Sequence, residues 1–430
     1  MLIARRSAAP RAKHRREMRR AACSALVVAS GAVPAAACSA DASRDGVERT
    51  DSAGVTIVRN TGPDTPLDWT IEEVLRLGGT DEGPESFFRV NGNGIASDAD
   101  GRLYILDIGN FHVLVFDAAG EHIRTLGREG AGPGEMGRPY SLLVSPDGAV
   151  HVVDLEKNAI IRFDANGAVM DEVRLPPRVR GNRATLAPGA GLFAARDTTL
   201  NATNQLRPGA PLRTTLVWVP IAGDAWGEPI ELARLEWRQP ESFGVVGPAN
   251  CPYKLNVPPI FYRSPVWRAG GDRVMHNSTE EYVVDVSAPA GALMSIRRDL
   301  PVVQATREVA AIEIGGVAVP ESDPCYSTAE ERADQATWLD RVPWIKDAVR
   351  TPDGTFLVLR RAPGQDPNER IDVFADDGAY MGTLPPAFPL SAVWRAPDEF
   401  ITLELDDLRR TYAVVHRVRR GVPRASPSER

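Results

Sequence analysis

Lysine is nearly absent from this 430-residue chain, in which positive charge is carried almost wholly by arginine. Lysine occurs only at positions 13, 157, 254 and 346. The 50 Lys and Arg residues do not balance the 57 Asp and Glu residues, so the formal net charge is -7. Because nucleic acids attract basic surfaces, this balance argues against a nucleic-acid partner.

Histidine and cysteine are also scarce, with 6 and 4 residues respectively. The sequence holds no C-x-x-C pair and no H-x-x-x-H pair, which are the spacings typical of zinc sites. It therefore predicts neither a metal site nor a cofactor.

The apolar run over residues 21–38 is too short to span a bilayer comfortably. It follows Arg15, Arg16, Arg19 and Arg20, which is the charged-then-apolar order of a secretory signal. Its end, Ala35-Ala36-Ala37-Cys38, resembles the bacterial lipobox, in which the cysteine is lipidated and becomes the first mature residue. We therefore predict a lipoprotein signal peptide over 1–38, with 1–17 as an extension upstream of a start at Met18. A plain signal peptide cleaved near Cys38 is the alternative.

A lipid on Cys38 would tie the protein to a membrane, and Ser39 after it favours the outer membrane. The polar stretch 39–53 lacks periodicity and is predicted to be a flexible tether, and 421–430 a disordered tail. Disulfides form in the oxidising envelope. Cys251 and Cys325 both lie in loops beside proline, so we predict a disulfide between them, with two buried thiols as the alternative.

Internal repetition is the feature that this chain has in abundance. The stretch Asn93–Gly127 recurs from Tyr140 onward, and Gly101, Asp107 and Phe116 each have a counterpart 47 residues later, at Gly148, Asp154 and Phe163. Each copy reads as four short strands with a turn at Asp-Gly. A period of this size is typical of a β-propeller blade.

More degenerate copies follow these two. A third covers 183–235, a fourth and a sixth begin at the identical tetrapeptides Val266–Ala269 and Val393–Ala396, and a fifth begins near Trp344. The sixth has only three strands, whereas Ile71–Gly79 reads as a fourth strand with none before it. Joining the two predicts an all-β fold over 54–420, a six-bladed propeller of four-stranded blades closed by the N-terminal strand.

The segment between blades four and five has a helical pattern instead. Thr328 and Glu331 form a capping-box pattern that predicts a helix continuing to Pro343, and a shorter helix is predicted from Thr306. We expect this small helical insertion to lie over one rim of the blades.

The motif residues of the first blade resemble the NHL repeat. They are Gly101-Arg102-Leu103-Tyr104, Asp107, Asn110, Phe116-Asp117 and the loop Gly127–Glu135. The whole chain is similar to bacterial six-bladed β-propeller lipoproteins with degenerate repeats of this kind. The resemblance implies the fold and the cell envelope, whereas the wider NHL group includes binding modules and some enzymes.

Two sets of residues are candidates for a site. Asp107 and Asp154 look like a carboxylate pair, but their place at strand ends favours turn residues that bind backbone. Cations before the first strands are expected to face one mouth of the central channel and to attract an anionic ligand or an acidic partner, unless they bind neighbouring carbonyls. This candidate set is Arg89, Arg138, Tyr140, Arg263 and Lys346.

The sequence thus predicts a secreted lipoprotein of the bacterial envelope that binds a ligand or a protein. The alternative is a propeller hydrolase or lyase with its site at the channel mouth. A binding role is favoured over catalysis because the inner ends of the blades are poor in carboxylates.

Overall fold

The computed structural model describes residues 46–421 apart from 178, 180–183, 188–190, 198–210, 223–224, 239–243, 253–254, 258, 263–264, 316–320, 366–367, 387 and 392. The predictions for the signal peptide, Cys38, residues 39–45 of the tether and the tail beyond 421 lie outside the described residues. The described chain is built almost wholly of strands, with two helices.

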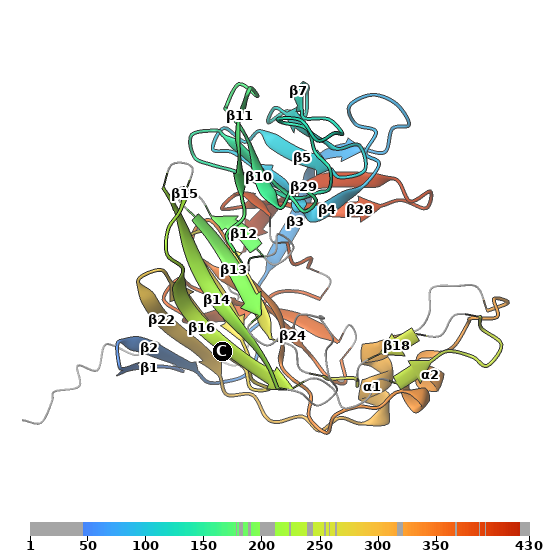
Figure 1. Ribbon diagram of the computed structural model, residues 1–430. Helices are drawn as coiled ribbons and strands as arrows, with labels where there is room; N and C mark the ends of the chain where they lie inside the picture. Colours follow the sequence, from blue (N-terminus) through green and yellow to red (C-terminus); the bar gives the residue numbers. More distant parts are fainter. Residues whose placement is uncertain are drawn as a thin grey trace, which may run out of the picture. The chain divides into compact units, whose positions relative to one another are not determined.

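The strands form six blades, as predicted, and each has a four-stranded antiparallel core (Figure 1). Blade 1 contains β4 (Val90–Ser97), β5 (Leu103–Asp107), β6 (His112–Phe116) and β7 (His122–Leu126). Blade 2 contains β8 (Pro139–Val144), β9 (Val150–Asp154), β10 (Ala159–Phe163) and β11 (Val169–Arg174). Blade 3 contains β12 (Ala184–Ala187), β13 (Gly191–Asp197), β14 (Pro211–Ala222) and β16 (Ile230–Arg238), with β15 (Ala225–Trp226) at the end of β14.

The later blades follow the same order. Blade 4 contains β19 (Val266–Gly270), β20 (Arg273–Asn277), β21 (Val283–Ala288) and β22 (Gly291–Arg298). Blade 5 contains β23 (Ile345–Arg350), β24 (Phe356–Arg361), β25 (Glu369–Phe374) and β26 (Tyr380–Thr383). Blade 6 contains β27 (Trp394–Ala396), β28 (Glu399–Leu405), β29 (Thr411–Arg420) and β3 (Trp69–Gly78).

The closing strand comes from the N-terminal side of the chain. Strand β3 pairs antiparallel with β29 from Tyr412 opposite Gly78 to Arg420 opposite Trp69, and Figure 1 shows the two ribbons beside each other. The prediction that Ile71–Gly79 completes the last blade is therefore confirmed. This pairing gives β29 a partner on each side, with β28 on the other, so β29 is not an edge strand of the last blade.

Apolar clusters join each blade to the next, including blade 6 to blade 1. The second strand of blade 1, β5, is buried throughout, and those of blades 2, 4 and 5 are largely buried, because a neighbouring blade covers each face. Phe116, Phe163 and Phe374 have at most 1% of their surface exposed, and each packs in an apolar cluster between two blades. The packing of strands on both faces explains why these segments read as nearly continuous apolar runs.

Two strands precede β3 and were not predicted as part of a blade. Strands β1 (Val47–Ser52) and β2 (Val55–Asn60) form a hairpin, and β2 pairs in parallel with β22 at the outer edge of blade 4. The prediction of a flexible tether is thus wrong for residues 47–52. The reason is burial, because Val47 and Val58 pack with Ala379 of blade 5.

The insertion between blades 4 and 5 joins the loop before blade 4. Strand β17 (Gly244–Val246) pairs with β18 (Leu255–Val257), and Figure 1 shows β18 beside helix α1 (Arg307–Ile314) and helix α2 (Ala329–Gln335). Residues of β17, α1 and α2 share an apolar cluster. The Cys251–Cys325 disulfide is present, which confirms that prediction.

The predicted capping box is present at Thr328 and Glu331, but α2 ends at Gln335 instead of Pro343. The chain beyond it is extended because Trp338 forms a parallel bridge with Ile260. This tertiary pairing overrides the local helical pattern.

Candidate functional site

The two repeated aspartates organise the loops that enter each blade. The Asp107 carboxylate accepts hydrogen bonds from the backbone N–H groups of Phe88 at 2.7 Å and Arg89 at 2.9 Å. Asp154 does the same for Gly137 and Arg138, at 2.8 and 3.0 Å. Both carboxylates are fully buried. The prediction that these residues are turn residues is confirmed, and they are not a catalytic pair.

The predicted channel-mouth cations have unequal surroundings. Arg89 and Arg138 are exposed, and neither forms an ion pair with any described residue. The carbonyl of half-buried Tyr140 accepts a hydrogen bond from Asn91 Nδ2 at 3.2 Å. Lys346 is neutralised instead, because its ammonium contacts the carboxylates of Glu369 and Glu313. Arg263 lies outside the described residues.

Blade 5 departs from the repeat at one position in its second strand and one position in its third strand. Strand register aligns Arg360 with Asp107 and Asp154, because Phe356 pairs with Phe374 as Leu103 pairs with Phe116. The same register places Asp372 where blade 1 has Leu114. Blade 5 thus has an arginine where blades 1 and 2 have a buried aspartate, and an aspartate where blade 1 has a buried leucine.

The two exchanged residues form a charge cluster with Arg298 and Asp64, which we define as Arg298, Arg360, Asp372 and Asp64. Three of these side chains are buried, and that of Asp64 is 39% exposed. Asp372 Oδ2 accepts hydrogen bonds from Arg298 Nη1 at 2.8 Å and Arg360 Nε at 2.9 Å. The side chains of Arg298, Arg360 and Asp372 are 1%, 3% and 0% exposed. Thr383 donates to Asp372 Oδ1 at 2.7 Å. Blades 4 and 5 are therefore joined by charges that water barely reaches.

Asp64 completes the cluster from the segment between β2 and β3. Its carboxylate binds Arg298 Nη1 at 3.0 Å and also pairs with Arg360. Burial raises the pKa of the Asp64 carboxyl, but the guanidinium groups of Arg360 and Arg298 outweigh it and hold that pKa below its usual range. The cluster is neutral overall, with two guanidinium groups and two carboxylates.

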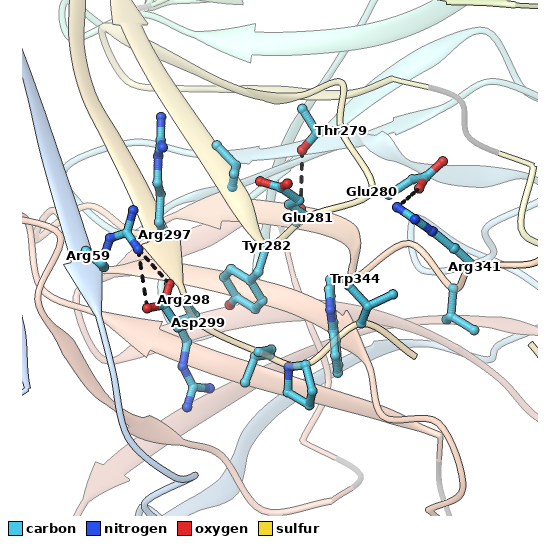
Figure 2. Close-up of a pocket in the computed structure, with 15 residues that line it drawn as sticks. Arg59, Thr279, Glu280, Glu281, Tyr282, Arg297, Arg298, Asp299, Arg341 and Trp344 are labelled. Carbon is cyan, nitrogen blue, oxygen red and sulfur yellow. Dashed lines mark hydrogen bonds and ion pairs between the residues drawn. The ribbon is translucent and has the colours of Figure 1, made fainter. Parts of the chain in front are cut away.

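A pocket of about 910 Å³, here called the blade 4/5 pocket, opens beside this cluster (Figure 2). The strand end at Arg297 and Arg298, the turn at Thr279–Tyr282 and the segment Arg341–Trp344 line it. Tyr282 and Trp344 border it but are only 2% and 8% exposed, and Leu300, Pro301 and Val302 contribute an apolar wall. Burial and the nearby Asp372 carboxylate raise the pKa of the Tyr282 hydroxyl well above its usual value, so this group stays neutral.

Most charges in the blade 4/5 pocket are already paired. Arg59 lies 3.5 Å from Asp299, and Arg341 lies 4.0 Å from Glu280; both pairs are drawn in Figure 2. Arg297 differs, because its Nε donates to the Ser295 hydroxyl at 3.2 Å and it forms no ion pair with a described residue. Arg297 is thus the cation of this pocket that remains able to bind an anion.

This pocket was not predicted from the sequence, although the fifth repeat carries a signal for it. When the fifth repeat is aligned with the first two, Arg360 is equivalent to Asp107 and Asp154. Trp344 is equivalent to Arg89 and Arg138. The expectation that Lys346 continues the arginine set is wrong, because Lys346 aligns with Asn91 and Tyr140.

In the part of the chain that the structure describes, no group of three or more His, Cys, Asp or Glu side chains is placed to hold a metal ion. Neither described helix has the length and apolar character needed to cross a membrane.

Residues 92–188 match a family described as a 6-bladed beta-propeller, DUF5128. The chain is a six-bladed β-propeller. The match covers blades 1 and 2 and the first strand of blade 3. No curated protein matches the sequence.

Several solved structures are similar to this propeller. A Bacteroides fragilis protein described as exported shares 12% identity at a TM-score of 0.42, over 85% of this chain and 100% of that one. A duf4221 family member from Bacteroides vulgatus shares 10% identity at a TM-score of 0.43, over 82% and 99%. Virginiamycin B lyase from Staphylococcus aureus shares 12% identity at a TM-score of 0.35, over 81% and 99%.

Proposed function

We propose that this propeller is a binding module of the bacterial cell envelope that takes a carboxylate-bearing, peptide-like ligand in the blade 4/5 pocket. The observation that carries the proposal is Arg297, which lines the pocket without an acidic partner among the described residues. A guanidinium group binds a carboxylate through two parallel hydrogen bonds.

The rest of the pocket supports the same ligand class. Its volume of about 910 Å³ lies within the usual range of ligand pockets, about 300–1,000 Å³. Val302 is 63% exposed at the apolar wall, whereas Tyr282 and Trp344 are only 2% and 8% exposed, so the apolar contact comes mainly from the wall. An apolar side chain next to a carboxylate is the chemistry that such a lining recognises.

The proposal is tested with four small probes that share one benzyl group. N-acetyl-phenylalanine carries a carboxylate and phenylalanine is a zwitterion, whereas N-acetyl-phenylalanine amide is neutral and phenylalanine amide is a cation. We expect the first two to bind, as measured by isothermal titration calorimetry. Arg297→Gln should weaken them by about tenfold to a hundredfold, the worth of one charge-assisted hydrogen bond.

Arg59→Gln is the matched control, because Arg59 lines the same pocket but is already paired with Asp299. It should change the affinity for N-acetyl-phenylalanine by less than about threefold. Equal binding of all four probes, or equal losses in the two variants, would contradict the proposal.

We further propose that a lipid on Cys38 holds the module at the outer membrane, and that its blades are degenerate NHL repeats. The arginine-rich start, the apolar run and the Ala-Ala-Ala-Cys end of the signal support the anchor. Cells fed an alkyne-tagged fatty acid should label the wild-type chain and leave Cys38→Ala unlabelled. Equal labelling of both chains would refute the anchor.

A further inference from the structure

A second pocket, of about 380 Å³, lies between blades 2 and 3 and shares no residue with the blade 4/5 pocket. We call it the blade 2/3 pocket. Its apolar lining includes Leu143, Ile160, Met170, Val173, Ile221 and Trp226. Ser145 and His151 are among its polar residues.

Comparison of the blades explains why space is left here. In blade 1, the Tyr104 ring packs between blades 1 and 2, and its hydroxyl donates to Asp98 Oδ2 at 3.0 Å. His151 holds the corresponding place in blade 2, and its Nε2 lies 3.2 Å from Ser145 Oγ. The shorter imidazole makes the homologous contact but fills less volume toward the next blade.

The opposite wall includes Gly191 of blade 3. Phe193 and Ala195 lie on the same side of β13 as Gly191 and pack toward blade 4, and a Cβ at Gly191 would meet Trp218. Gly191 therefore borders the pocket through its backbone, and the residue that leaves space in this interface is His151.

The polar groups of the pocket suit a neutral ligand. Trp226 Nε1 already donates to the Arg174 carbonyl at 2.6 Å, and Arg162 Nε donates to Asp171 at 2.5 Å. Burial and the charge of Arg162 lower the pKa of His151, so its imidazole is neutral at physiological pH. An ion would lose its hydration here, whereas a hydroxyl group can bond to the imidazole.

The neighbouring Ser145 and Asp147 do not make this a hydrolase site. Ser145 Oγ contacts Asp147 and donates to the Ala149 carbonyl at 3.1 Å. Thr351 makes the same contacts in blade 5, with Asp353 and with the Thr355 carbonyl at 3.1 Å. The arrangement is a repeated turn, so the pocket is suited to binding instead of catalysis.

We propose that the blade 2/3 pocket binds a small neutral phenol, whose ring takes the volume that the Tyr104 side chain fills in blade 1. The hydroxyl of the phenol bonds to His151, and its ring packs on the apolar side chains beside Trp226. The site is independent of the blade 4/5 pocket.

Fluorine NMR of 4-fluorophenol tests this site. The wild-type protein should broaden the fluorine signal, and p-cresol should restore it by competition, whereas toluene and 4-hydroxybenzoate should not. His151→Tyr restores the blade 1 residue, so it should weaken binding by at least about tenfold and raise the midpoint of thermal unfolding. His122→Tyr makes the same change on an exposed strand and should leave binding unaltered.

Two results would overturn the proposal. One is a fluorine signal that the wild-type protein leaves sharp, and the other is equal broadening by wild type and His151→Tyr. If His151→Tyr does not fold, Met170→Trp serves instead, because Met170 lines the pocket and is 55% exposed. The larger indole should block entry, and unchanged binding by that variant would equally reject the site.

Discussion

Replacing Asp372 with asparagine is expected to lower the free energy of unfolding by about 3–5 kcal/mol, the usual cost of removing one partner from a buried ion pair. The substitution keeps the shape of the side chain but leaves Arg298 and Arg360 with only Asp64 to balance them. Because both guanidinium groups are almost inaccessible, water cannot take over the lost interaction. Urea unfolding of the variant and the wild type measures the difference.

Asp377→Asn is the matched control for this experiment. Asp377 pairs with Arg49 at 2.7 Å, but these side chains are 55% and 31% exposed. Exposed pairs contribute about 0–1 kcal/mol, so this variant should unfold close to the wild type. Similar losses in the free energy of unfolding for both variants would show that burial does not determine how much the charge cluster contributes to stability.

The same cluster makes stability depend on pH through Asp64. The folded-state pKa of Asp64 is lowered, so its contribution is complete above the usual aspartate pKa of about 3.9. This contribution to stability is lost as the pH falls through the lowered pKa that Asp64 has in the folded state. The wild-type protein should therefore lose part of its advantage over Asp64→Asn in strongly acidic buffer.

Removing the Cys251–Cys325 disulfide is the second change with a large expected effect. The bond joins residues 74 apart in sequence, and closing a loop of that length is worth about 4 kcal/mol in the chain-entropy account. The double variant Cys251→Ser, Cys325→Ser should therefore open the insertion that contains α1 and α2. Hydrogen exchange should speed up in residues 307–314 and 329–335.

The blades provide the control within the same molecule. Their strands pack through separate apolar clusters, so exchange in β5 and β9 should stay slow in the double variant. Loss of protection across all blades would show that the insertion is not a separate unit. An unchanged exchange rate in α1 and α2 would show that the bond contributes little.

Most of the fold follows from patterns that lie within the sequence. The 47-residue spacing of Gly101, Asp107 and Phe116 indicates which residues of the first two blades correspond. The single strand at Ile71–Gly79 completes the last blade, which has only three strands of its own. Strand β2 could not be placed this way, because a parallel partner leaves no local sequence signal. The end of α2 depends on a bridge between Trp338 and Ile260, which are distant in sequence.

The site was harder to predict than the fold. The prediction for Arg89 and Arg138 rests on their place just before the first strands, whereas the blade 4/5 pocket lies beside residues that break the repeat. Neither Arg360 nor Asp372 is unusual when its own strand is considered alone. They stand out only when the strand register aligns blade 5 with the first two blades. Arg297 is distinguished from Arg59 and Arg341 by the structure alone, because both of those arginines are paired with acidic residues.

Hydrogen exchange with N-acetyl-phenylalanine tests the proposed binding site most directly. The probe should slow exchange in residues 279–283, 297–302 and 341–344, which line the blade 4/5 pocket, and this protection should disappear in Arg297→Gln. Protection around Arg89 and Arg138 instead, or protection that survives in Arg297→Gln, would contradict the site proposed for this propeller.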